Sequence, residues 1–291
     1  MENEHTQKLS RREFLKLIGA AASGLLMAAA TANPSFASSG EELPPEEHWA
    51  MLYDATKCSG CRECEVACKS YNKLSEEDVD DLSGNTFTLI KLYQSEDGSQ
   101  KSFRKFQCMH CVEPACAASC PVSALHKIEN GPVIYDSYKC IGCRYCMQAC
   151  AFGAPRYDWS LAYPLIRKCE MCYHRENGPA CAEICPKQAL MFGKRGDLIE
   201  IAKARIAVNA GKYFEDRVYG EFEGGGTSIL ILSAVPFEAI GLPALDPKPL
   251  PDRTRWALNI VPAIFFGVGG AMAAVYRSSK KSDKEAEEKK A

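Results

Sequence analysis

Sixteen cysteines constrain what this chain of 291 residues can fold into more than any other feature of its sequence. They fall into four blocks of four, and none is left over. The blocks are Cys58, Cys61, Cys64 and Cys68; Cys108, Cys111, Cys116 and Cys120; Cys140, Cys143, Cys146 and Cys150; and Cys169, Cys172, Cys181 and Cys185. The spacing within the blocks decides between disulfides, single metal ions and metal clusters.

The four blocks form an internal repeat. Residues 53–68 and 135–150 align without gaps at an offset of 82, and ten of the sixteen aligned positions are identical. Residues 114–125 and 179–190 align at an offset of 65, and both begin Pro-Ala-Cys-Ala. The chain therefore contains two kinds of block in alternating order.

The spacing C-x2-C-x2-C-x3-C of the first and third blocks favours cubane iron–sulfur clusters. Such a run presents three thiolates to one cluster, and in two-cluster ferredoxins its fourth cysteine ligates the other cluster. Structural zinc uses separate C-x2-C pairs, and cysteines separated by two residues seldom meet disulfide geometry. Sixteen thiolates therefore predict four 4Fe-4S clusters. In bacterial ferredoxins a proline follows the fourth cysteine of the run. The second and fourth blocks have this proline, Pro121 and Pro186, whereas the first and third blocks have Lys69 and Ala151 instead.

Residues 1–37 resemble a twin-arginine (Tat) export signal. Adjacent Arg11 and Arg12 precede an apolar run of small residues, and Ser35 and Ala37 fit a cleavage site. A membrane anchor is the weaker alternative, because the segment is rich in Ala and Gly. The twin-arginine route carries folded proteins, so clusters could be inserted in the reducing cytoplasm before export.

A second apolar stretch lies near the C-terminus. Residues 256–276 carry no charge, and their length suffices for one membrane crossing. A buried core helix is the alternative interpretation. The charged tail, 277–291, would lie in the cytoplasm, in keeping with the positive-inside bias. Five prolines in residues 236–255 predict an extended linker before the transmembrane helix.

Two β-hairpins are expected between the blocks. Asn130-Gly131 between two apolar runs is a strong hairpin signal. Residues 86–107 predict a second hairpin that turns at residues 96–99. Short strands, turns and short helices are therefore expected around the cysteines.

The sequence contains no evident catalytic constellation. His110 and His174 lie near cysteines, but four thiolates already complete each predicted cubane. We therefore expect both histidines to be loop residues that are hydrogen-bonded near a cluster.

The sequence resembles the iron–sulfur subunits of the formate dehydrogenase beta, dimethyl sulfoxide reductase B and hydrogenase families. It is most similar to the HybA-type subunit of membrane-bound nickel–iron hydrogenases. The similarity is carried by residues 51–61, 107–125, 140–147 and 219–245. Coverage is nearly complete, and the motifs are specific for the superfamily but less so for the partner. Ala151 departs from the pattern, because such subunits usually have a proline there.

The resemblance implies which cysteines share a cluster, because in that superfamily the first block pairs with the fourth and the second with the third. The implied ligand sets are Cys58, Cys61, Cys64 and Cys185; Cys68, Cys169, Cys172 and Cys181; Cys108, Cys111, Cys116 and Cys150; and Cys120, Cys140, Cys143 and Cys146. The implied fold is α+β, with two interleaved bacterial-ferredoxin-like units in residues 45–235. The outer unit takes about 50–70 and 165–200, and the inserted unit about 105–160.

The resemblance also implies the function. We expect a non-catalytic electron-transfer subunit on the periplasmic side of the inner membrane, anchored by its C-terminal transmembrane helix. It would relay electrons between a nickel–iron hydrogenase and a membrane quinone-reactive or cytochrome b-type subunit. The equivalent subunit of a formate dehydrogenase or of a molybdopterin reductase is the alternative. Nothing in the sequence indicates a nucleic-acid partner, since the net charge is only −2.

Two interpretations from other classes remain. A zinc-stabilised interaction module would explain some of the cysteine pairs but not the third cysteine of each run. A stand-alone catalyst is disfavoured because no open metal site or pair of nucleophile and base is visible in the sequence.

Overall fold

The computed structural model describes residues 43–95, 98, 100–159 and 165–288, which belong to two compact units, 43–253 and 254–288. The segment predicted to be an export signal lies outside the described residues. The strands are β1 (Trp49–Asp54), β2 (Leu89–Gln94), β3 (Lys101–Phe106), β4 (Leu125–Lys127), β5 (Val133–Tyr135), β6 (Arg156–Tyr157), β7 (Ile166–Arg167), β8 (Leu190–Lys194) and β9 (Ile229–Leu232). The α-helices are α2 (Glu63–Asn72), α3 (Ala115–Ala118), α4 (Tyr145–Ala149), α5 (Ala180–Glu183), α6 (Arg195–Val208) and α7 (Asp252–Glu288). Short 3-10 turns are η1 (Pro45–Glu47), η2 (Phe214–Asp216), η3 (Glu223–Gly225) and η4 (Glu238–Ile240).

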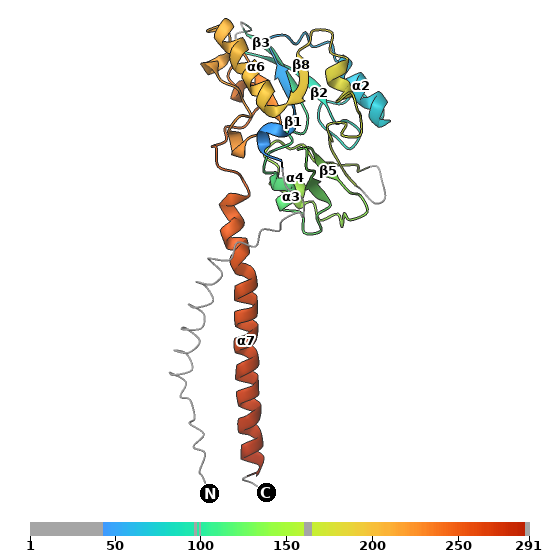
Figure 1. Ribbon diagram of the computed structural model, residues 1–291. Helices are drawn as coiled ribbons and strands as arrows, with labels where there is room; N and C mark the ends of the chain where they lie inside the picture. The colour runs from blue at the N-terminus through green and yellow to red at the C-terminus, as the bar shows by residue number, and fades with distance from the viewer. Residues whose placement is uncertain (1–42, 96–97, 99, 160–164, 289–291) are drawn as a thin grey trace. The chain divides into compact units, whose positions relative to one another are not determined.

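A three-stranded sheet in the order β8-β1-β9 forms the centre of the first unit. β1 pairs antiparallel with β8 and parallel with β9, and its apolar sequence suits a strand that is buried on both faces. On one face, Leu52 packs against Leu198 and Ala202 of α6, which covers the sheet (Figure 1). On the other face, Tyr53 packs towards Cys64 and Cys181. The sheet thus separates a core without cysteines from the core that contains them.

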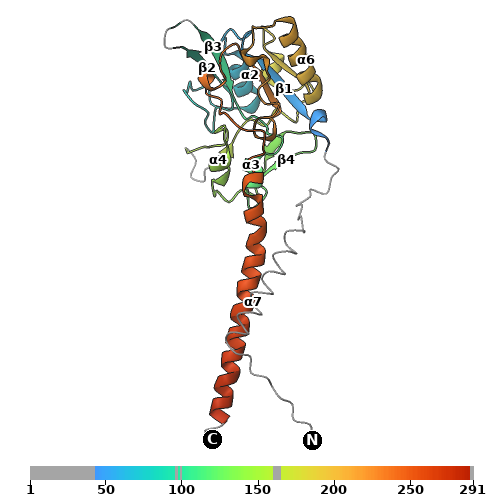
Figure 2. The same cartoon turned by 90° about the vertical axis from the view of Figure 1, so that its left-hand side faces the viewer.

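The internal repeat of the sequence is also a repeat of strand pairing. Tyr53 of β1 lies opposite Leu190 of β8, and Tyr135 of β5 lies opposite Leu125 of β4. These residues correspond at the offsets of 82 and 65 found in the sequence. The helices follow the same scheme, because α2 packs beside α5 and α3 beside α4. Figures 1 and 2 both show α3 and α4 with the β4–β5 pair, away from β1.

Both expected hairpins are confirmed. β4 and β5 pair across the turn at Gly131, which takes a φ of +111° that favours glycine. β2 and β3 pair from Leu89 opposite Phe106 to Gln94 opposite Lys101. The second hairpin lies between the first and second cysteine blocks, where it covers the loop of the first block.

The proline-rich segment differs from the expected extended linker. Phe237, Ile240 and Leu242 are at most 2% exposed and belong to the main core. Further along, the Gly224 N–H donates to the Asp246 carbonyl at 2.8 Å. The prolines therefore shape a segment that packs onto the domain, because their neighbours supply large apolar side chains.

The second unit contains the C-terminal part of α7. Within the described residues, one helix, Asp252–Lys280, is long and apolar enough to cross a membrane. None of its most apolar stretch is buried, and Phe265 and Phe266 are more than 70% exposed. This exposure is consistent with a membrane anchor and does not fit a soluble core helix.

A buried carboxylate joins β1 to the C-terminal half of the domain. Asp54 is 0% exposed and accepts hydrogen bonds from the Thr56 hydroxyl at 2.6 Å and the Tyr213 hydroxyl at 3.1 Å. It also pairs with Arg205 of α6 at 3.2 Å. The carboxylate thus holds α6 against the strand that precedes the first cysteine block.

We expect Asp54→Ala to destabilise the domain by about 3–5 kcal/mol, because it leaves a partly buried guanidinium without its partner. The measurement is the thermal unfolding midpoint of the anaerobically purified protein, followed by circular dichroism. Asp136→Ala is the matched control, since Asp136 is the repeat counterpart but pairs with exposed Lys139. Equal losses in the two variants would contradict this role of Asp54.

Candidate metal centre

The first two cysteines of blocks one and three lie on tight loops with the same backbone path, and the third lies in the first turn of the helix that follows. Gly60 and Arg62 take φ values of +73° and +64° before α2 begins. Gly142 and Arg144 take φ values of +70° and +65° before α4. Left-handed residues at these positions turn the chain so that successive thiols face the same side.

The first loop closes over a cavity that we call the Cys58 cavity. Its walls include four cysteine side chains, Cys58, Cys61, Cys64 and Cys185. Cys185 comes from the fourth block, after α5, and its sulfur accepts a hydrogen bond from the Ala189 N–H at 3.3 Å. Tyr53, Ile90 and Leu190 complete the apolar part of the wall. The first and fourth blocks therefore meet at one site.

The third loop closes over a corresponding cavity, the Cys140 cavity. It is lined by Cys120, Cys140, Cys143 and Cys146. Cys120 comes from the second block, and its sulfur accepts a hydrogen bond from the Ala124 N–H at 3.2 Å, the repeat equivalent of the Ala189 contact. Its wall also includes Leu125, Tyr135, Tyr157 and Ile166.

A third group of thiols, which we call the Cys68 set, combines the last cysteine of block one with three of block four. Burial and, next, the neighbouring Cys181 raise the pKa of Cys68 to about 12, and Cys172 adds to the effect. Burial and then Cys68 raise the pKa of Cys169 well above its usual value. Cys68, Cys169 and Cys172 therefore each lie near at least one other thiol of the set.

The remaining thiols form the Cys108 set, Cys108, Cys111, Cys116 and Cys150. Burial raises the pKa of Cys111 well above its usual value, and Cys108, Cys150 and Cys116 follow as causes. Burial and then Cys108 raise the pKa of Cys116 to about 12. Ala151, where the resemblance leads one to expect a proline, lies exposed in the turn after Cys150. The structure thus places Cys185 beside the first block and Cys120 beside the third, while the four complete ligand sets that the resemblance implies stay a prediction.

The arrangement of the thiols suits a group larger than one ion. A tetrahedral zinc ion draws four thiolates to about 2.3 Å from a single point. Among the described residues, no three His, Cys, Asp or Glu side chains form a group that could hold one metal ion. The cysteines of the two cavities are spread around a wall instead. Because burial raises the thiol pKa values, binding of iron would release protons from these sulfurs.

Three buried donors support the fit of a sulfide-containing group. The hydroxyls of Tyr135 and Tyr157 and the Nε2 atom of His110 have no hydrogen-bond partner among the described residues. The Nδ1 atom of His110 accepts from the Val133 N–H at 3.0 Å, so the neutral ring carries its proton on Nε2. Cluster sulfides and thiolates are acceptors for such donors. His110 is thus a hydrogen-bonded loop residue, as expected, whereas His174 has its ring 3.6 Å from that of Tyr173.

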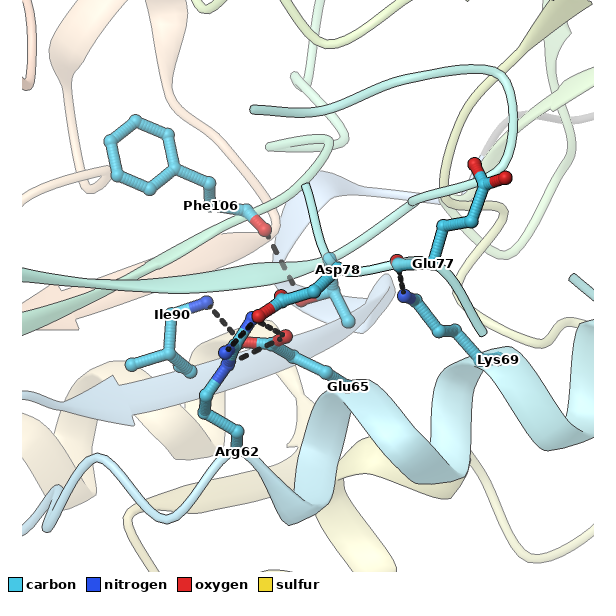
Figure 3. A network of polar contacts seen from close by, with 8 residues as sticks. Arg62, Glu65, Lys69, Glu77, Asp78, Ile90 and Phe106 are labelled. Atoms are coloured by element: carbon cyan, nitrogen blue, oxygen red, sulfur yellow. Dashed lines mark hydrogen bonds and ion pairs between the residues drawn. The ribbon is translucent and has the colours of Figure 1, made fainter. Parts of the chain in front are cut away.

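A network of charges fixes the start of α2 (Figure 3). Arg62 bonds to Glu65 at 3.0 Å and to Asp78 of the acidic loop at 2.5 Å. Buried Glu65 also accepts the Ile90 N–H at 2.6 Å, and Lys69 donates to the carbonyl oxygen of Glu77. The acidic loop of residues 75–85 is therefore tied to the helix that carries Cys64 and Cys68.

Four residues of the site were not predicted from the sequence: the buried lysines Lys105 and Lys168, and Tyr135 and Tyr157. Lys105 lies inside the core and donates to Thr88 Oγ1 and to Gln107. Burial acts to lower the Lys105 pKa, but the surrounding thiolates, Cys181 first, outweigh it and raise the pKa. Lys168 donates to the backbone carbonyls of Val133 and Cys169. Only the repetition of Tyr53 as Tyr135 offered a signal for any of these residues.

Known proteins resemble this chain over most of its length. A profile of the 4Fe-4S dicluster domain matches residues 100–195. A protein of Nitratidesulfovibrio vulgaris is 42% identical over 97% of this chain and 80% of its own length. The hydrogenase-2 operon protein HybA of Escherichia coli O157:H7 is 36% identical over 82% of this chain and 85% of its own. The nitrate-inducible formate dehydrogenase iron–sulfur subunit of Escherichia coli K12 is 33% identical over 68% of this chain and 73% of its own length.

The mixed helix and strand content, the four groups of cysteines and these relatives agree with one another. The protein belongs to the family of electron-transfer iron–sulfur subunits of oxidoreductase complexes that includes HybA, the formate dehydrogenase iron–sulfur subunit and the B subunit of anaerobic dimethyl sulfoxide reductase.

Proposed function

We propose that this protein carries four 4Fe-4S clusters and passes electrons singly along them. The proposed ligand sets are the cysteines of the Cys58 cavity, the Cys68 set, the Cys108 set and the Cys140 cavity. The observation that carries this proposal is the presence of Cys185 in the Cys58 cavity and of Cys120 in the Cys140 cavity. Each cavity thus combines three thiols of a C-x2-C-x2-C loop with one from a distant block, as in interleaved two-cluster ferredoxin units.

Electrostatic effects between thiols of different sets support a linear order of the four proposed clusters. Cys181 raises the pKa of Cys64, after burial, which links the Cys58 cavity to the Cys68 set. Cys108 contributes to the raised pKa of Cys169, which links the Cys68 and Cys108 sets. Cys146 does the same for Cys116 and links the Cys108 set to the Cys140 cavity.

The two ends of this order reach the surface. Cys61 at the Cys58 cavity and Cys143 at the Cys140 cavity are exposed, whereas the thiols of the middle sets are either buried or partly buried. Electrons would therefore enter and leave at these two ends. The clusters supply the redox chemistry, while the protein spaces them, excludes water and donates hydrogen bonds to the sulfurs.

The proposed partners are a nickel–iron hydrogenase and a membrane quinone-reactive or cytochrome b-type subunit. The match to HybA over most of both sequences supports this choice. The alternative is the same role beside a formate dehydrogenase or a molybdopterin reductase, whose iron–sulfur subunits match less of the sequence. Anaerobic purification from membranes with identification of the bound large subunit distinguishes the two.

The proposed location is the periplasmic face of the inner membrane. Arg11 and Arg12, followed by a run of small apolar residues, support Tat export. The apolar stretch of α7, with lysines after it, supports a single C-terminal crossing with its tail in the cytoplasm. Protease protection of a C-terminal epitope in spheroplasts tests this orientation.

We expect about sixteen irons and sixteen sulfides per protein molecule, and Cys185→Ser to lose one cluster, about a quarter of this iron. The measurement is iron and acid-labile sulfide in anaerobically purified protein, with low-temperature EPR after reduction. Lys187→Val is the control, because exposed Lys187 lines the Cys58 cavity and corresponds to Val122 in the other cavity. Stoichiometric zinc without an EPR signal would overturn the proposal.

The two loop glycines provide a second test. A methyl group at Gly60 would overlap the ring of Phe103, whereas one at Gly142 would lie 3.3 Å from the Tyr157 hydroxyl. Both alanine variants carry the cost of a left-handed residue, about 1–2 kcal/mol. We therefore expect Gly60→Ala to lose EPR intensity of the Cys58-cavity cluster, and Gly142→Ala to retain most of its own. Similar intensities in the two variants would show that Phe103 does not confine the first loop.

A further inference from the structure

The two cavities contain equivalent tyrosines with different hydrogen bonding. Tyr53 lines the Cys58 cavity and Tyr135 lines the Cys140 cavity, and the two residues correspond at the offset of 82. Each is paired with a leucine in the repeated strand arrangement, Leu190 or Leu125. Backbone position therefore does not distinguish them.

The hydroxyl of Tyr53 is already occupied. It donates to the carbonyl oxygen of Phe103 at 2.7 Å. A phenol has one O–H proton, so this bond leaves Tyr53 no proton for a group in its cavity. Phe103 belongs to the β2–β3 hairpin, which covers this cavity.

The hydroxyl of Tyr135 is buried and has no partner among the described residues, and the same holds for Tyr157. Both side chains line the Cys140 cavity. After burial, Cys140 is a cause of the raised pKa of both phenols, as Cys58 is for Tyr53, so each phenol lies near a sulfur of its own cavity and only the hydrogen bonding differs. Arg144 lies 5.2 Å from the centre of the Tyr157 ring and holds that ring over the loop.

Burying an O–H group without an acceptor is costly, so two such groups in one cavity call for an acceptor there. Cysteine sulfurs and cluster sulfides in this cavity can accept both protons. Hydrogen bonds to cluster sulfurs stabilise the more negative, reduced state and raise the reduction potential.

We propose that Tyr135 and Tyr157 donate hydrogen bonds to the sulfurs of the cluster in the Cys140 cavity and raise its reduction potential, while Tyr53 makes no such contribution in the Cys58 cavity. This inference rests on the proposed function, since it requires a cluster in each cavity. It assigns the difference between two sites of nearly identical sequence to the hydroxyls that face them.

The test is an EPR-monitored redox titration of the holo-protein, purified anaerobically with its partner subunits. The signal of the Cys140-cavity cluster is identified by its loss in Cys120→Ser. We expect Tyr135→Phe and Tyr157→Phe each to lower the midpoint potential of that cluster, and the double variant to lower it most. A tenfold change in the ratio of reduced to oxidised cluster corresponds to ~59 mV for one electron, and we expect roughly this change for the double variant.

Tyr53→Phe is the matched control and should leave the potential of the Cys58-cavity cluster unchanged. A second readout is electron–nuclear double resonance after exchange into heavy water, in which the exchangeable coupling of the Cys140-cavity cluster should weaken in the Phe variants. An unchanged potential and coupling in the double variant, with its clusters intact, would overturn this inference alone. Wild-type protein without 4Fe-4S signals would instead overturn the proposed function.

Discussion

The antiparallel pairing of β1 with β8 is the interaction on which the rest of the structure depends. β1 leads into the first cysteine block and β8 follows the fourth, so their pairing brings Cys185 to the loop of Cys58, Cys61 and Cys64. The β4–β5 pairing does the same for the second and third blocks over a much shorter stretch of sequence. Without these ladders, each loop would present three thiols and lack a fourth. The sheet therefore determines the composition of the site, although it supplies no sulfur itself.

Burial keeps the thiols of the domain protonated while no metal is bound. Desolvation disfavours free thiolates, and burial raises the pKa of Cys64, Cys68 and Cys116 to about 12. Binding of iron would displace these protons, and the free energy of metal binding would add to the stability of the fold. Buried Lys105 acts in the opposite sense to burial, since its positive charge lowers the pKa of Cys64 and Cys68 and favours their thiolates. Insertion of clusters before export, as proposed, would fit a protein whose core is incomplete without them.

Much of this arrangement could be predicted from the sequence, and the remainder has identifiable causes. The spacing of the cysteines, the repeat at offsets of 82 and 65, and Asn130-Gly131 report local geometry, so the loops and both hairpins were predictable. The grouping of the cysteines came from the resemblance, because spacing alone left the partner of each fourth cysteine open. Phe237, Ile240 and Leu242 were missed as core residues, since five nearby prolines indicate an extended segment unless tertiary packing opposes it. Lys105 was missed because a buried cation depends on neighbours that are distant in sequence.

Sequence identity between the repeats hides a structural difference that the β2–β3 hairpin creates. The β2–β3 hairpin lies between blocks one and two, and it places Phe103 against Tyr53 and Gly60 beside the Cys58 cavity. The carbonyl oxygen of Phe103 accepts the hydrogen bond that the Tyr53 hydroxyl donates, and the Phe103 ring leaves no space for a side chain at Gly60. At the Cys140 cavity, the space beside Gly142 is occupied by the Tyr157 hydroxyl. One insertion can therefore make two copies of the same loop differ in the donors that face their sulfurs. Under the proposed function, such a difference in hydrogen-bond donors would change the reduction potential of a cluster and leave all sixteen proposed cysteine ligands unchanged.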